Sequence, residues 1–145
     1  AGGILYLTNK IDNKVVNGSI FCMSTIIPVT VSSAAEAEYG ALFMLGKEAE
    51  PLRNTLQDLG YPQPPTKIVS DNSCAVGVTN NKVKQKRSKA FDMRFHWIKD
   101  RVKQKHFEVI WEPGSTNLAD FFTKAHSAKH HSEVRPFYVQ DKASP

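Results

Sequence analysis

The stretch that decides the fold class is SAAEAEYGALFMLGKEAEPLRNTLQDL at residues 33–59, because it carries the strongest helical pattern in the chain. Ser33, followed three residues later by Glu36, forms a capping box and predicts where the helix begins. Pro51 is expected to kink or split the helix, and Gly60 is expected to end it. A stripe at steps of three and four predicts one core-facing side. Its members are Glu38, Ala41, Leu42, Leu45, Ala49, Leu52, Leu56 and Leu59.

Short apolar runs on both sides of this helix predict strands, and a second amphipathic pattern predicts another helix. The first two runs are expected to form a hairpin, with Asp12 and Asn13 in its turn. Phe107, Val109 and Trp111 alternate with polar residues and are expected on the inner face of a late strand. Strands are predicted at residues 3–8, 15–23, 67–70 and 106–112, and helices at 88–104 and after Ser115 or Thr116. The order predicts an α/β architecture with one sheet and helices on its faces.

Composition allows one hydrophobic core, since 41% of the 145 residues are hydrophobic and 23% are charged. The formal net charge is +5. Residues 82–105 contain ten Lys or Arg and two Asp, a local charge of +8, so the remaining residues sum to −3. This basic segment favours a phosphate backbone as partner. A solvated helix surface explains the same charges and stays open at this point.

Several classes of protein are excluded by what the sequence lacks. No apolar run approaches the roughly 18 residues of a membrane span, and no signal peptide pattern is present. The two cysteines, Cys22 and Cys74, lie far apart without a CxxC pattern, which argues against a disulfide framework and a zinc site. We therefore expect an intracellular protein without membrane contact.

Three carboxylates are candidates for chemistry. Glu38 lies on the apolar stripe of the long helix, where a carboxylate needs a partner. Asp71 follows a short strand, a position where α/β sheets hold ligands, although a helix cap explains it equally well. Asp120 lies near the start of the last predicted helix, where a favourable interaction with the helix dipole also accounts for it. Together, Glu38, Asp71 and Asp120 match the converging oxygen ligands that two Mg²⁺ ions require, which is typical of phosphodiester chemistry.

Four blocks of the sequence resemble, in order, the ribonuclease H domain that closes the polyprotein of copia-type retrotransposons. The resemblance covers residues 1–125 and leaves residues 126–145 as a polar C-terminal tail. It implies a ribonuclease H-like fold, in which helices flank a mixed sheet. The blocks are SSAAEAEYGAL (32–42), IVSDNSCAV (68–76), KRSKAFDMRFHWIKDRV (86–102) and NLADFFTKA (117–125).

The resemblance implies an endonuclease that cleaves the RNA strand of an RNA/DNA hybrid with two Mg²⁺ or Mn²⁺ ions. Glu38, Asp71 and Asp120 match the family's metal-binding carboxylates. The reverse transcriptase of the same polyprotein is the expected neighbour, in the cytoplasm, a virus-like particle or the nucleus. Contacts to phosphates and 2′-hydroxyls would report helix type, not base order. The residues expected to contact nucleic acid are Asn72, Lys82, Lys84, Lys86, Arg87, Lys89 and Arg94.

The sequence departs from the family at its start, where AGGILYL resembles the second strand and not the first. We therefore expect the first, central strand and its catalytic aspartate to be absent from this chain, and Asp12 is not expected to replace that residue. Weaker cation binding should follow, and two alternatives to an active nuclease stay open. One is a catalytically inactive, hybrid-binding or structural module of a reverse transcriptase. The other is a basic nucleic-acid binder in which Asp71 and Asp120 are structural caps. Trp97, off the apolar stripe, is a candidate contact for nucleic acid or a neighbouring domain.

Overall fold

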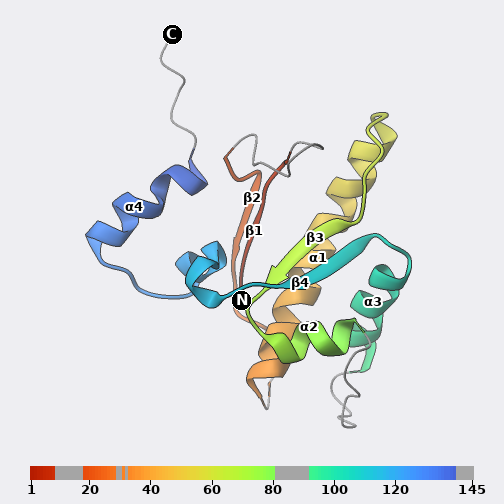
Figure 1. Ribbon diagram of the computed structural model, residues 1–145, viewed down its shortest axis with the longest axis horizontal. Coiled ribbons are helices and arrows are strands. Elements are labelled where there is room, and N and C mark those ends of the chain that lie inside the picture. The colour runs from red at the N-terminus through yellow and green to blue at the C-terminus, as the bar shows by residue number, and fades with distance from the viewer. Residues whose placement is uncertain (9–17, 29–30, 32, 81–91, 140–145) are drawn as a thin grey trace. The chain divides into compact units, whose positions relative to one another are not determined.

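Strands and helices alternate along the chain, which confirms the predicted α/β class (Figure 1). The computed structural model describes residues 1–8, 18–28, 31, 33–80 and 92–139. The chain divides into two units, each with its own contacts. The first unit comprises Ala1 and Ile26–Asn117, and the second comprises Gly2–Thr25 and Leu118–Pro145. In the part of the chain that is described, no helix is long and apolar enough to cross a membrane.

The long helix α1, Ala34–Asp58, begins where the capping box predicts, since the Ser33 side chain accepts the Glu36 N–H at 3.2 Å. It runs through Pro51 as one helix and ends before Gly60, whose φ of 87° favours glycine. The buried face is displaced from the predicted stripe, because α1 approaches its neighbours through small residues. A Cβ atom on Gly46 would lie 2.9 Å from the Ile98 side chain. The buried residues of α1 are Tyr39, Gly40, Leu42, Gly46, Ala49 and Arg53.

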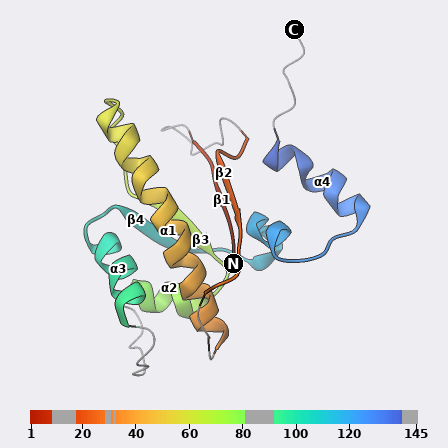
Figure 2. The ribbon, with the colours of Figure 1, turned by 180° about the vertical axis from the view of Figure 1, so that it is seen from behind.

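The first unit is built around a parallel strand pair. Strand β3, Thr66–Ser70, pairs with β4, Phe107–Trp111, and the connection between them contains α2, Ser73–Thr79, and α3, Asp92–Lys103. Parallel neighbours require such a crossover. One face of the pair is buried against helices, and α1 crosses it (Figure 2). The core consists of Tyr39, Leu42, Ala49, Ile68, Ala75, Val78, Phe95, Ile98, Phe107 and Val109.

The second unit contains the predicted hairpin, with β1, Gly2–Leu5, antiparallel to β2, Phe21–Ser24. The described strands thus form two two-stranded sheets in place of the single mixed sheet that the sequence predicts. The segment expected to be a short helix after Ser115 or Thr116 is two 3₁₀ turns, η1, Gly114–Thr116, and η2, Leu118–Phe122. Of these, η2 belongs to the second unit and η1 to the first.

Helix α4, Ala128–Tyr138, lies in the segment that the sequence analysis left as a polar tail. Hydroxyl groups hold its end. The Tyr6 hydroxyl donates to the Phe137 carbonyl at 2.8 Å, and the Ser19 hydroxyl donates to the Tyr138 carbonyl at 3.2 Å. The Tyr138 hydroxyl donates to the Leu118 carbonyl at 2.6 Å. The first two bonds satisfy carbonyls at the end of α4, and the third ties α4 to η2, which explains an ordered helix without a sustained apolar stripe.

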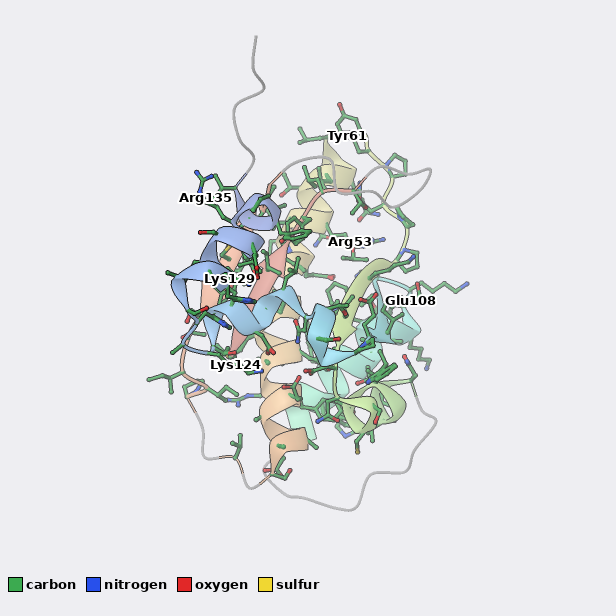
Figure 3. The ribbon with its side chains drawn as sticks, turned by 60° about the vertical axis from the view of Figure 1, so that its left-hand side comes forward. Arg53, Tyr61, Glu108, Lys124, Lys129 and Arg135 are labelled. Atoms are coloured by element: carbon green, nitrogen blue, oxygen red, sulfur yellow. The ribbon has the colours of Figure 1, made fainter. Side chains whose placement is uncertain are left out.

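Arg53 ties α1 to the chain that enters β3 (Figure 3). Its guanidinium donates to the carbonyls of Gln63, at 2.7 Å, and Pro64, and to the Thr66 hydroxyl at 3.3 Å. Only 6% of the residue is exposed. Charge-assisted hydrogen bonds from one buried cation to three acceptors thus close the loop between the helix and the strand.

Replacing Arg53 by methionine should therefore destabilise the first unit by about 1–3 kcal/mol, since it removes hydrogen bonds from a charged donor to three acceptors. Urea denaturation of Arg53→Met and the exposed-site control Asn54→Ala measures this. Equal midpoints for the two variants would contradict the anchoring role of Arg53.

Candidate functional site

Asp71 and Asn72 follow β3, and by sequence either of them could cap the next helix. The structure shows which one does. Asn72, and not Asp71, is the N-cap of α2, and its side-chain oxygen accepts the Ala75 N–H at 3.0 Å. Asn72 was predicted to contact nucleic acid, and no finding tests that role. Because Asn72 caps the helix, capping does not account for Asp71. Asp71 follows β3 directly, so its carboxylate stands at the carboxyl end of a parallel strand, where α/β folds hold ligands.

Two residues at and just after the end of β4, Trp111 and Gly114, lie close to Asp71. The Trp111 indole N–H donates to the Asp71 main-chain carbonyl at 3.0 Å. A Cβ atom on Gly114 would lie 2.9 Å from Oδ2 of Asp71, so a side chain there would force the carboxylate to shift. Trp111 was expected on the inner face, but it is 52% exposed because β4 ends at this residue.

Glu38 of α1 reaches the same end of β3. The Ser70 hydroxyl donates to Oε2 of Glu38 at 3.4 Å and accepts the Asn72 N–H at 3.2 Å. Glu38 is thus linked through one side chain to the residue that precedes Asp71. The structure therefore places Glu38 in contact with the residue that precedes Asp71, and both carboxylates belong to the first unit.

The residue after Glu38 fixes the orientation of α1 at this point. The buried Tyr39 hydroxyl donates to the Ala75 carbonyl at 2.7 Å and accepts a hydrogen bond from the Thr79 hydroxyl at 3.2 Å. Burial raises the pKa of Tyr39 to about 12, so the hydroxyl stays protonated and can donate throughout the physiological range. The Tyr39 contacts hold α1 against α2 beside the two carboxylates.

Asp120 belongs to the second unit, within η2. Its carboxylate pairs with Lys124, four residues later, and its side chain is 29% exposed. A ring nitrogen of His126 lies 3.3 Å from the Asp120 carbonyl. The structure describes Asp120 among these neighbours of its own unit, so its joining Glu38 and Asp71 at one site stays a prediction.

Most of the predicted nucleic-acid contacts, namely Lys82, Lys84, Lys86, Arg87 and Lys89, lie outside the described residues. Arg94 is described: it lies in α3, and its guanidinium stands 5.8 Å from the centre of the Phe43 ring.

Trp97 is part of the packing between helices. The centre of its ring lies 5.5 Å from that of Phe43, in an edge-on arrangement, and 6.2 Å from that of Phe107. The Arg101 guanidinium carbon lies 5.3 Å from the centre of the Trp97 ring. This packing accounts for Trp97 without a nucleic-acid contact and corrects the expectation that it lies off the packed face of its helix.

Sequence reasoning missed three residues around Asp71, namely Ser70, Trp111 as a donor, and Gly114. Ser70 carried a signal, because strict alternation after Ile68 in β3 predicts a buried position at residue 70 and a polar residue there needs hydrogen-bond partners. Trp111 and Gly114 carried none, since the sequence does not show that the end of β4 touches the turn after β3.

The donor atoms at the end of β3 suit a hard divalent cation. Among the described residues of each unit, no three His, Cys, Asp or Glu side chains gather closely enough to hold a metal ion by themselves. Mg²⁺ commonly binds through one or two carboxylates and takes its other ligands from water and phosphate oxygens. The Glu38 and Asp71 carboxylates therefore fit such an ion chemically, with further ligands from outside this pair.

Comparison with known proteins finds similarity to a retrotransposon polyprotein. The chain is 33% identical over 107 residues to the retrovirus-related Pol polyprotein from transposon TNT 1-94 of Nicotiana tabacum. The match covers 74% of the chain. The chain is thus similar to a segment of a retrotransposon Pol polyprotein. The chain spans about 8% of the length of this relative. No protein-family profile matches the chain, and no solved structure matches it.

This similarity supports an origin in a retrotransposon polyprotein, the coarser part of the resemblance drawn from the four sequence blocks. It does not by itself assign an activity to the segment. The geometry at the end of β3 provides the independent observation from which a function is argued.

Placing a methyl group at position 114 should disturb Asp71 and little else. In a Gly114→Ala variant the new Cβ atom meets Oδ2 of Asp71, so the carboxylate must move. We expect the amide resonances of Asp71 and Asn72 to shift while stability changes little, because position 114 is exposed and Oδ2 is the end of a side chain that can rotate away. The control is Ser115→Ala, at the exposed neighbouring position. Identical amide resonances of Asp71 and Asn72 in the two variants would refute the close approach of Gly114 to Asp71.

Proposed function

We propose that this chain is the ribonuclease H-type endonuclease domain of a retrotransposon polyprotein and that it cleaves the RNA strand of RNA/DNA hybrids. The observation that carries the proposal is that Asp71 follows β3 directly after Ser70, which bonds to Glu38, while Asn72 and not Asp71 caps the helix. The similarity to a retrotransposon Pol polyprotein supports the same function. A structural cap at Asp71, the basis of the plain nucleic-acid-binder alternative, is not what the structure shows.

The proposal includes a ribonuclease H-like fold and a reverse transcriptase domain as neighbour in the same polyprotein. The parallel pair β3–β4, crossed by α1 on one face, supports this fold. The position of Glu38 on that helix and of Asp71 after that strand agrees with the family pattern on which the proposal is based.

Glu38, Asp71 and Asp120 would hold the Mg²⁺ or Mn²⁺ ions, two in an intact site. Bound divalent ions would lower the pKa of an attacking water and stabilise the leaving oxygen of the phosphodiester. The chain supplies carboxylate oxygens for this purpose. Glu38 comes from a helix whose position Tyr39 fixes, and Asp71 comes from a turn fixed by Trp111 and Asn72.

The basic segment at residues 82–105 would hold the hybrid by its phosphates. Such contacts position a duplex without reading its bases. Of the described cations in α3, Arg94 and Arg101 each lie over an aromatic ring, which restricts their side chains before a phosphate binds.

Cleavage of a labelled RNA/DNA hybrid in Mg²⁺ or Mn²⁺ tests the nuclease directly. The Asp71→Asn variant should lose cleavage by more than about 100-fold, because even partners of metal ligands cost 10–100-fold when removed. Asp58→Asn, an exposed acid at the end of α1, is the control of equal charge change and should retain activity. Equal activity of Asp71→Asn and the unaltered chain would refute the role of Asp71.

The alternative function, an inactive hybrid-binding module, predicts a different result in the same assay. Both the unaltered chain and Asp71→Asn would then bind the hybrid and leave it uncut. Extending the chain at its N-terminus with an aspartate-bearing strand then decides between the two. Cleavage gained by the extension would indicate an incomplete catalytic site, and its absence would indicate a binding module.

Salt dependence of hybrid binding tests the basic segment. Replacing Lys84, Lys86 and Arg87 by glutamine should reduce the slope of log affinity against log salt by about 2–3, since each phosphate contact contributes nearly one unit. The charge-matched control replaces Lys124, Lys129 and Arg135 of the second unit and should leave the slope nearly unchanged. Equal slopes for the two triple variants would mean that the hybrid does not bind to the basic segment.

A further inference from the structure

Ser70 is a polar residue in a position where the strand pattern calls for an apolar one. It follows the buried Ile68 at the period of two that defines the inner face of β3, and it is only 3% exposed. A buried hydroxyl without partners costs free energy, so its hydrogen bonds must account for it.

The two hydrogen bonds of Ser70 join the elements that carry the two carboxylates. Its hydroxyl donates to Oε2 of Glu38 on α1, and its oxygen accepts the Asn72 N–H in the turn that contains Asp71. One side chain therefore spans from the helix to the turn. The hydroxyl is itself too deeply buried to touch a bound substrate.

We propose that Ser70 is a positioning residue of the carboxylate site. Its hydroxyl holds the Glu38 side chain toward the end of β3 and fixes the Asp71–Asn72 turn, so both carboxylates are in place before a divalent cation binds. The cation-binding part rests on the proposed function, whereas the positioning of Glu38 does not.

The first unit provides a matched comparison for a merely structural hydroxyl. Thr79 is completely buried, and its hydroxyl donates to the Ala75 carbonyl at 2.8 Å while also bonding to the Tyr39 hydroxyl. It shares the burial and the two bonds of Ser70 but contacts neither carboxylate through the bonds described. The Tyr39–Ala75 hydrogen bond, which holds α1 against α2, does not need the Thr79 hydroxyl. Loss of that hydroxyl should therefore lower stability and leave Glu38 in place.

The test measures the side-chain conformation of Glu38 by NMR scalar couplings in the full chain without metal. We expect one dominant Glu38 rotamer in the unaltered chain and in Thr79→Val. In Ser70→Ala we expect averaging among rotamers, and the conservative Ser70→Thr should restore the single rotamer because it restores the hydroxyl. Averaging in the unaltered chain, or an unchanged rotamer in Ser70→Ala, overturns the proposal.

A Mn²⁺ titration of the same variants extends the test to cation binding. Affinity should fall roughly tenfold in Ser70→Ala, the usual effect of losing a partner of a metal ligand, and should be nearly unchanged in Thr79→Val. A drop of equal size in both variants would mean that Ser70 acts through stability alone, which overturns the proposal. If Glu38 depends on Ser70 as expected but no chain binds Mn²⁺ or cuts the hybrid, the positioning of Glu38 stands and the proposed nuclease function fails.

Discussion

The hydrogen bond from the buried Tyr39 hydroxyl to the Ala75 carbonyl determines how α1 lies against α2, and the candidate site depends on that placement. Glu38 precedes Tyr39 on the helix, so a shift or rotation of α1 would carry the Glu38 carboxylate away from Ser70. Gly46 allows α3 to approach α1 closely on the next turns of the helix. The position of one carboxylate is thus set by the packing of a whole helix.

Most elements of the fold could be predicted because their burial follows a simple period. The hairpin, α1, β3, α3 and β4 all have apolar residues at regular spacing, and the structure contains each of them. Helix α4 lacks that signal, because hydroxyl-to-carbonyl bonds from Tyr6 and Ser19 and ring contacts around Phe121 hold it instead. The two hydroxyl bonds join residues more than a hundred positions apart in sequence, and no local pattern reveals them.

The sequence proposes candidate carboxylates for the site but not the arrangement of the residues around them. Asp71 and Asn72 are both good helix caps, so only the structure shows that Asn72 takes the cap and leaves Asp71 for another role. The apolar stripe gave Glu38 the correct side of α1, although the buried face centres on Tyr39 and Leu42. Ser70 bears on both carboxylates, yet a serine at a strand end carries little information by itself.

The two candidate carboxylates Asp71 and Asp120 have physically different surroundings. Around Asp71 the groups that fix the turn are neutral, namely the Ser70 hydroxyl, the Asn72 side-chain amide and the Trp111 indole. These neutral groups restrict the geometry of the turn and add no positive charge of their own beside the carboxylate. Asp120 instead pairs with Lys124. A cation that takes Asp120 as a ligand must first displace that ammonium group, which costs little because exposed pairs of this spacing contribute only about 0.3–0.5 kcal/mol.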